Sequence, residues 1–238
     1  MLRLLLFILA CTSANIAIAN VINFDGIEYQ AVDWNSASTV TNMATGDANG
    51  ITVTLSAFDM ASDSISSADY STDPTAFGNL NFPGSAILES VSLFGVPDFN
   101  EFDTVNFSSP VDSILMIIGS PNTTADAPQY GPSRWDFDDN LTLTVVDDES
   151  SGFEILSGNI LNAIGVTGPG NHISGVIRVS GTNLNSDSWQ HVLDSTGNTD
   201  KMDITFAVNQ TVIPIPAAAW LFGSALLGFV SIARYKRA

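Results

Sequence analysis

The residues of this chain best suited to chemistry are three oxygen-bearing side chains at alternate positions. Asp136, Asp138 and Asn140 follow this spacing, so an extended or looped backbone would turn their oxygens to one side. Hard cations such as Ca²⁺ take six to eight oxygen ligands, and Asp-x-Asp-x-Asn opens the calcium loop of EF-hands. Here the required glycine is Leu141, and the twelfth position holds Asp147 in place of glutamate. We therefore expect either a Ca²⁺ loop of another kind or a solvated turn.

An aromatic residue, Trp135, lies directly beside these carboxylates. Its large ring is suited to stacking on a sugar, and packing in the core or at its rim is the alternative. Because Trp135 adjoins both the acidic stretch and a long polar connection, it is the tryptophan that we favour for a glycan contact. A carbohydrate-binding module with a Ca²⁺ loop is accordingly one function class for this chain.

Signals for an enzyme are few. The two histidines, His172 and His191, have no spacing typical of zinc ligands. The sequence also lacks a nucleophile elbow and a phosphate-binding glycine loop. A glycoside hydrolase needs only two well-placed carboxylates, but nothing in the sequence singles out a pair among the 25 acidic residues. We expect a protein that is not an enzyme and keep a secreted hydrolase as the least favoured class.

The elements that must position these residues are predicted to be β-strands. Short runs of β-branched and aromatic residues alternate with clusters of Asn, Asp, Ser, Thr and Gly, which indicates an all-β fold. Ile114–Ile118 is continuously apolar, as in a strand buried on both faces. Met60–Tyr70 could form a short helix. About a dozen strands predict a single antiparallel β-sandwich of jelly-roll type over residues 20–211. The candidate strands are Val21–Phe24, Ile27–Trp34, Ile51–Phe58, Ala86–Phe94, Thr104–Phe107, Ser113–Gly119, Leu141–Val146, Phe153–Leu156, Asn159–Val166, Ile173–Ser180, Trp189–Leu193 and Asp203–Val208.

The charge of this predicted domain excludes some partners. Four of the seven basic residues lie near the chain ends, so Arg134, Arg178 and Lys201 stand against all 25 acidic residues, a net charge of −22. Such a surface repels nucleic acid and anionic membranes but attracts divalent cations. The single cysteine, Cys11, lies outside the domain, so no internal disulfide is available and stability must come from packing or bound ions.

Residues 1–19 have the pattern of a secretory signal peptide. Arg3 supplies a positive charge, Leu4–Ala10 is an apolar core, and Ala17-Ile18-Ala19 fits a small-x-small cleavage site. We expect export through the Sec translocon and cleavage by signal peptidase before Asn20.

Residues 212–238 form a second targeting pattern. Pro214, Ile215 and Pro216 precede an uncharged apolar run over residues 217–233. At 1.5 Å per residue this run is about 25 Å long, the lower limit for a transmembrane helix. A basic cluster follows and would hold that end in the cytoplasm. The cluster consists of Arg234, Lys236 and Arg237.

The order of proline motif, apolar helix and basic cluster resembles the PEP-CTERM sorting signal of Gram-negative bacteria. Pro214–Ser224 is similar to the branch of that family with the motif Val-Pro-Leu-Pro-Ala, although Ile215 stands where the name-giving motif has glutamate. The resemblance covers about a tenth of the chain. It implies an inner-membrane intermediate, processing by an exosortase, and delivery to the cell surface or extracellular matrix. A plain membrane anchor is the alternative for this tail.

These observations favour an exported protein with a structural or adhesive role in an exopolysaccharide matrix. Its expected partners are the exosortase and, in the matrix, the exopolysaccharide itself.

Overall fold

All the named elements of the structure are β-strands. The structure, a computed structural model, describes residues 21–69, 77–83, 87–94, 102–119, 133–148, 152–157, 159–164, 174–193 and 201–209. Every strand pair within these ranges is antiparallel. The prediction of an all-β, antiparallel domain is therefore confirmed for the described part of the chain.

The strands form one connected sheet of 14 strands whose longest path runs β1-β2-β14-β8-β13-β9-β12-β11. Strands β3, β4 and β5 join this path at β8, strand β10 joins at β13, and strands β6 and β7 join at β14. The bounds are β1 Val21–Phe24, β2 Ile27–Ala31, β3 Asp33–Ser38, β4 Met43–Ala48, β5 Ile51–Ser56, β6 Ser66–Asp69, β7 Ile87–Phe94, β8 Asp103–Gly119, β9 Ser133–Phe137, β10 Thr142–Asp148, β11 Phe153–Leu156, β12 Ile160–Ala163, β13 Gly175–Leu193 and β14 Lys201–Asn209.

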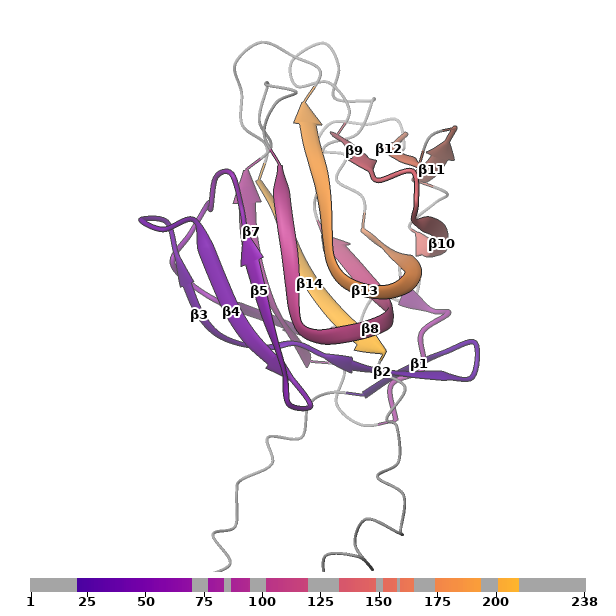
Figure 1. Cartoon of the computed structure of the whole chain (residues 1–238), viewed down its shortest axis with the longest axis horizontal. Coiled ribbons are helices and arrows are strands. Elements are labelled where there is room, and N and C mark those ends of the chain that lie inside the picture. Colours follow the sequence, from indigo (N-terminus) through magenta and orange to yellow (C-terminus); the bar gives the residue numbers. More distant parts are fainter. Residues whose placement is uncertain are drawn as a thin grey trace, which may run out of the picture.

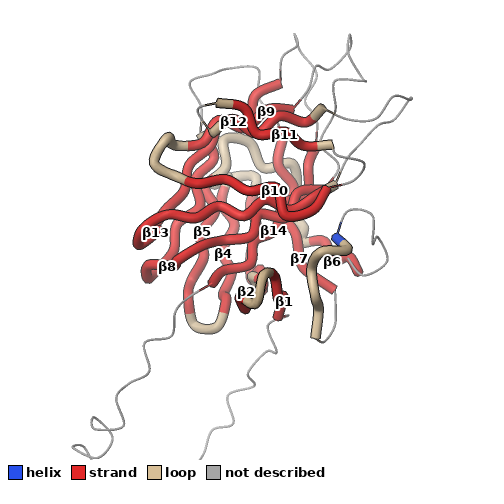
Figure 2. The backbone as a smooth tube through the Cα atoms, turned by 90° about the vertical axis from the view of Figure 1, so that its right-hand side faces the viewer, coloured by secondary structure: helices blue, strands red, loops and turns tan. Residues whose placement is uncertain are grey.

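Two long strands, β8 and β13, fold this sheet over on itself. Figure 1 shows both strands bending sharply in their middle, and their mutual register shifts between Ser180 and Ser186. The first half of β8 pairs with β5, and its second half pairs with β14. Likewise the first half of β13 pairs with β10 and the second half with β9. The two halves of each strand therefore belong to two layers that share the main hydrophobic cluster. Figure 2 looks onto the layer in which β10, β13, β8 and β14 lie side by side.

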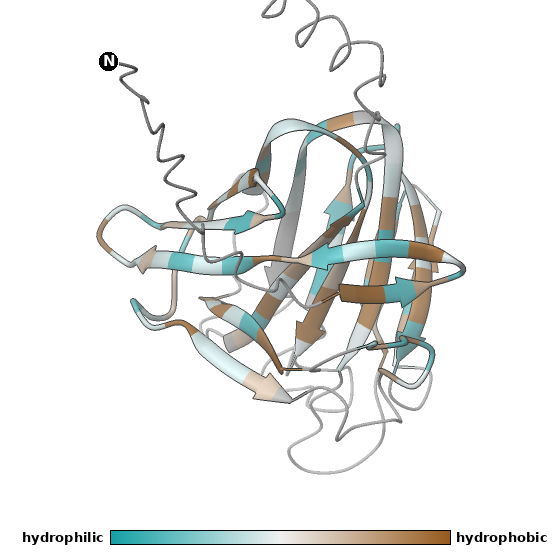
Figure 3. Cartoon of the chain, turned by 90° about the horizontal axis from the view of Figure 1, so that it is seen from below, coloured by the Kyte–Doolittle hydropathy of each residue, from teal (hydrophilic) through white to brown (hydrophobic). Residues whose placement is uncertain are grey.

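The core occupies both faces of one layer. Ile114, Met116 and Ile118 of β8 belong to the main hydrophobic cluster, whereas Leu115 and Ile117 belong to a second cluster. The prediction of a strand buried on both faces is confirmed for this run. Elsewhere the alternation of hydrophilic and hydrophobic residues along the strands is visible in Figure 3. The second cluster is covered from outside by Ile22 and Tyr29 of the β1–β2 hairpin, together with Phe77 and Leu80.

Most of the predicted strands are present, and some are joined. Thr104–Phe107 and Ser113–Gly119 are the two halves of β8, and Ile173–Ser180 and Trp189–Leu193 fall largely within β13. The possible helix at Met60–Tyr70 is wrong, since this segment contains β6, which pairs with β7. Strands β4, β6 and β9 escaped prediction because they are short and contain few β-branched residues.

Gly46 of β4 is required by the close approach of the preceding strand. A Cβ atom at this position would lie 2.5 Å from Cγ1 of Val32 and 2.6 Å from the carbonyl oxygen of Asp33. We therefore expect Gly46→Ala to lower the free energy of unfolding by about 1–3 kcal/mol through overpacking. Chemical denaturation would measure this loss. Gly119→Ala is the matched control, because its nearest contact would be an ordinary 3.7 Å, and equal losses in both variants would contradict the steric argument.

Candidate functional site

The acidic stretch singled out by its spacing is a strand followed by a turn. Asp136 lies in β9, where it pairs with Ile160 of β12 on one side and with Gln190 of β13 on the other. The turn begins at Asp138, whose carbonyl oxygen accepts a hydrogen bond from the Leu141 N–H at 3.0 Å. The backbone thus places Asp136 near the end of a strand and Asp138 at the start of an exposed turn.

Asn159 fastens this turn from the neighbouring chain segment. Its side-chain amide donates hydrogen bonds to the carbonyl oxygens of Asp138 at 2.9 Å and of Leu141 at 2.6 Å. Asn159 itself adopts φ 55°, a left-handed conformation that asparagine tolerates better than most residues. The turn is therefore held in place by a residue 18 positions after Leu141.

Trp135 does not serve as a glycan-stacking platform in this structure. Strand alternation turns Trp135 and Phe137 inward and Asp136 outward, and Trp135 is 0 % exposed. Its ring packs against Phe153 with the centroids 5.9 Å apart. Trp135 belongs to the main hydrophobic cluster, so its expected surface role is corrected to a core role.

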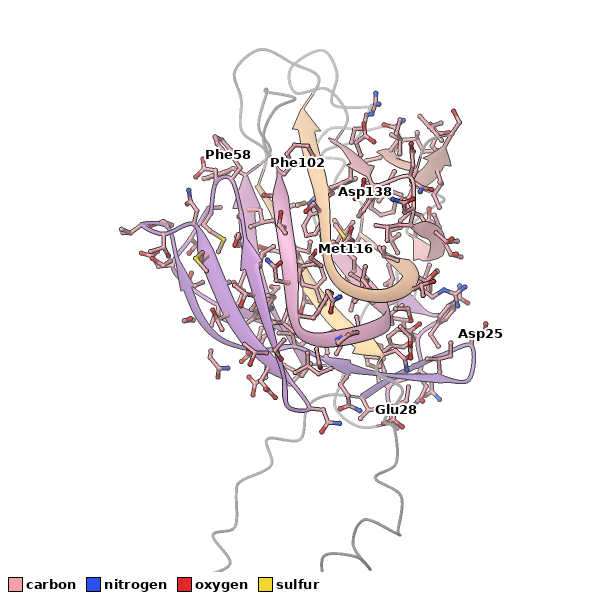
Figure 4. All side chains as sticks on the ribbon, viewed as in Figure 1. Asp25, Glu28, Phe58, Phe102, Met116 and Asp138 are labelled. Carbon is pink, nitrogen blue, oxygen red and sulfur yellow. The ribbon has the colours of Figure 1, made fainter. Side chains whose placement is uncertain are left out.

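A surface hollow of about 300 Å³ opens beside the turn. Its lining combines carboxylates, a hydroxyl and aromatic side chains, and Figure 4 labels two of the lining residues, Phe102 and Asp138. The lining residues are Phe102, Asp136, Phe137, Asp138, Asp139 and Ser188. The structure thus brings Asp136 and Asp138 to one hollow, while Asn140 is exposed outside its lining.

Sequence reasoning missed Phe102, Asp139 and Ser188 as members of this site. Phe102 is 55 % exposed and immediately precedes β8. A signal for it was available, because Val105 and Phe107 face the core and the alternation then turns Phe102 outward and Asp103 inward. Nothing in the local sequence predicted Ser188 as a site residue. It lies at the hollow because β13 pairs with β9.

Two carboxylates are buried on the inner face near the hollow. Asp187 of β13 is 2 % exposed, and neither of its carboxylate oxygens has a hydrogen-bond partner among the described residues. Burial raises the pKa of Asp187 to about 7, and the charge of Asp138 raises it further. The nearby Ser188 N–H lowers the pKa in part, because its dipole favours the ionised carboxylate. It does not form a hydrogen bond with Asp187.

The second buried carboxylate, Asp103, opens β8. Its oxygen accepts a hydrogen bond from the Phe58 N–H at 3.0 Å. Burial raises the pKa of Asp103 to about 6, and the Phe58 N–H and the nearby Trp189 indole lower it in part. Asp103 therefore ties the start of β8 to the segment at Phe58, and both segments carry exposed phenyl rings at the end of the molecule labelled in Figure 4.

The Ca²⁺ loop stays a prediction. In the described ranges, no three His, Cys, Asp or Glu side chains come close enough together to hold a metal ion. Asp136 forms an ion pair with Arg134, whose guanidinium nitrogen lies 3.9 Å from the Asp136 carboxylate. A cation at the hollow would have to draw Asp138 and Asp139 together from the exposed turn.

Both targeting patterns lie outside the described residues. This applies to the predicted signal peptide, residues 1–19, and to the whole tail. The tail residues concerned are Pro214, Ile215, Pro216, Arg234, Lys236 and Arg237. Among the residues that the structure does describe, there is no helix long and apolar enough to cross a bilayer. The chain matches no protein-family model, no curated protein and no solved structure.

Proposed function

We propose that this chain is a surface or extracellular-matrix protein of a Gram-negative bacterium, exported through the Sec translocon and sorted by an exosortase. Its acidic β-sandwich, of jelly-roll type, would serve a structural or adhesive role in exopolysaccharide. The observation that carries this proposal is the tail, in which Pro214-Ile215-Pro216 precedes an apolar run and a basic cluster. The resemblance of this order to PEP-CTERM signals supports exosortase recognition.

The positions of the two ends of the described domain agree with attachment through the tail. Val21 of β1 pairs with Gln30 of β2, and Gln30 pairs with Val208 of β14. The three residues form one row, so Val21 and Val208 are about 10 Å apart at the usual strand spacing. Both ends of the domain therefore lie on one side (Figure 1). Phe102 and the hollow lie toward the opposite side, which an attached domain would turn away from the membrane.

The net charge of the domain is compatible with a soluble domain outside the cell. A net charge of −22 keeps the domain soluble and mutually repulsive. The domain is held together by packing of two hydrophobic clusters.

Sorting is tested by changing the motif in cells that contain the exosortase. We expect the mature protein from wild-type cells to lack residues 217–238 and to leave the inner membrane. Pro214→Ala with Pro216→Ala is expected to trap the uncut form in that membrane, because the recognition element is removed while the apolar run is kept. Mass spectrometry of the C-terminus and membrane fractionation would measure both results. Intact full-length protein in wild-type cells would instead identify a plain anchor.

A carbohydrate-binding module is the second candidate, and the hollow favours it. Carboxylates and a hydroxyl group beside an exposed phenyl ring are the kinds of group that position sugars, and these line the hollow. Phe102 takes the aromatic role first expected of Trp135. Ca²⁺ would be an accessory of this function, through Asp136 and Asp138. A secreted hydrolase is the third candidate and would use two of the same carboxylates.

A further inference from the structure

We propose that the hollow between Phe102 and the Asp138 turn binds a glycan that carries positive charge, that is, an amino sugar with free amines. This inference deepens the proposed matrix role by naming a ligand class. It rests on three features of the described residues: an unusual exposed ring, carboxylates without ion partners, and a buried carboxylate behind them.

The exposed ring of Phe102 adjoins an anchored residue. Phe102 is 55 % exposed, but the next residue, Asp103, is 4 % exposed and accepts the Phe58 N–H. The phenyl ring therefore projects from an anchored backbone. Stacking on a sugar would then require no ordering of the backbone at this position, which lowers the entropic cost of binding. Phe58, 42 % exposed at the same end, extends the aromatic surface beyond the hollow.

The carboxylates of the turn are available for a cation. Asp138 and Asp139 have no ion-pair partner among the described residues. Arg134 is the arginine nearest to this site, and it is directed to Asp136. Carboxylates accept hydrogen bonds from sugar hydroxyl groups. They accept stronger hydrogen bonds from ammonium groups, because donor and acceptor then carry opposite charges.

An independent feature is the buried carboxylate behind the hollow. Asp187 precedes Ser188, which lines the hollow, and lies close enough to Asp138 for the two charges to interact. Its two oxygens have no partner in the described part of the chain. An unsatisfied buried acceptor of this kind calls for an explanation. A cationic group in the hollow supplies one, because its charge would favour the ionised form of Asp187, whose pKa burial otherwise raises to about 7.

The overall charge selects among glycans. A domain with net charge −22 repels polysaccharides rich in uronic acids or other anions. A neutral glycan would be tolerated, whereas an amino sugar with free amines would be complementary. The hollow therefore favours the positively charged class over the neutral one.

The test is calorimetric titration of the full-length protein, in detergent, with a β-1,4-linked glucosamine tetramer. At about pH 6 most of its amines are protonated, since amines of this kind have pKa values above that pH. We expect Phe102→Ala, and separately Asp138→Asn with Asp139→Asn, to raise the dissociation constant about tenfold, the size of one good aromatic or charge-assisted contact. The fully N-acetylated tetramer, which is neutral, is expected to bind more weakly than the glucosamine tetramer.

A matched control separates the site from the diffuse acidic surface. Asp25→Asn with Glu28→Gln also removes two charges, but at the opposite end of the molecule in Figure 4. We expect this variant to bind within about twofold of wild type, as for surface charges far from a contact. Equal weakening by the two charge-removing variants would overturn the proposal, and so would equal affinity for the N-acetylated tetramer.

Trilysine distinguishes a sugar site from a site for any cation. Its binding is expected to weaken less on Phe102→Ala than that of the glucosamine tetramer, because trilysine has no sugar face to stack and keeps only a weak exposed cation–π contact. If Phe102→Ala weakens trilysine and the glucosamine tetramer equally, the glycan assignment fails. The sorting proposal is judged separately: the Pro214→Ala, Pro216→Ala variant is expected to keep full affinity for the tetramer, since its changes lie outside the hollow.

Discussion

Replacing Asp187 by asparagine is expected to stabilise the fold at about pH 8 and to change it little at about pH 4, because only the ionised carboxylate is penalised by burial. Asp187 is 2 % exposed and its oxygens lack partners among the described residues. Asparagine has nearly the same shape and cannot ionise. We expect a gain of about 2 kcal/mol at the alkaline end, or roughly 4–8 °C in melting temperature for a domain of this size.

The direction follows from the two pKa values of Asp187. Burial raises the folded-state pKa to about 7 from an ordinary value of 3.8. Between these values the folded state keeps a proton that the unfolded state has lost, so stability falls as pH rises from about 4 to about 7 and stays low above that. The full difference corresponds to about 4 kcal/mol at 1.36 kcal/mol per pKa unit. The buried amide of asparagine offsets part of this gain, because it also lacks a partner.

Melting temperatures measured from about pH 4 to about pH 8 check this prediction. Burial raises the pKa of Asp103 to about 6. In the Asp187→Asn variant we therefore still expect stability to fall as the pH rises from about 4 to about 6, because of Asp103. Asp112→Asn is the matched control, because Asp112 is an exposed aspartate on β8 and its change is expected to stay within about 0.5 kcal/mol. A variant that loses stability at about pH 8 would show that ionised Asp187 has a favourable partner in the folded protein.

Trp135→Ala is expected to lower the free energy of unfolding by about 3–5 kcal/mol, the usual loss for a large buried aromatic residue. Trp135 is 0 % exposed and packs against Phe153. The substitution removes both the ring and its contacts and leaves a cavity in the main cluster. Chemical denaturation of the purified protein would measure this loss.

Phe102→Ala is the matched aromatic control for Trp135→Ala. Because Phe102 is 55 % exposed, its replacement is expected to change stability by no more than about 0.5 kcal/mol. The two variants thus separate a core role from a surface role. If Trp135→Ala kept its stability but lost glycan binding, the corrected role of Trp135 would be wrong and the original stacking role would be right.

Much of the fold was predictable because strand formation is a local property. The apolar run Ile114–Ile118 is visible in the sequence, and it lies in β8, where all five residues are buried. The predicted strand Leu141–Val146 largely coincides with β10. The bends of β8 and β13 were not predictable in the same way. Each was read as two separate strands, since a bend breaks the local pattern while the backbone pairing continues through it.

The candidate site was predictable only in part. The spacing of Asp136 and Asp138 drew attention to the correct turn, but it did not distinguish a loop from a strand. Trp135 and Phe137 of β9 point inward and pack in the core. This alternation would have predicted a strand, but the acidic residues around it favoured a loop or turn. Which face of a strand is buried depends on the partners on either side, and these partners come from distant parts of the chain.

The sequence by itself determined the all-β class and the net charge of −22 over residues 20–211, and it is the source of the predicted targeting roles of residues 1–19 and 212–238. These are properties of composition and of short local runs. Only the tertiary structure decided that Phe102, Asp138 and Ser188 line one hollow, and that Trp135 and Asp187 are buried. The reason is that β8, β9 and β13 meet through long-range backbone pairing, whose register sets the neighbours of each side chain.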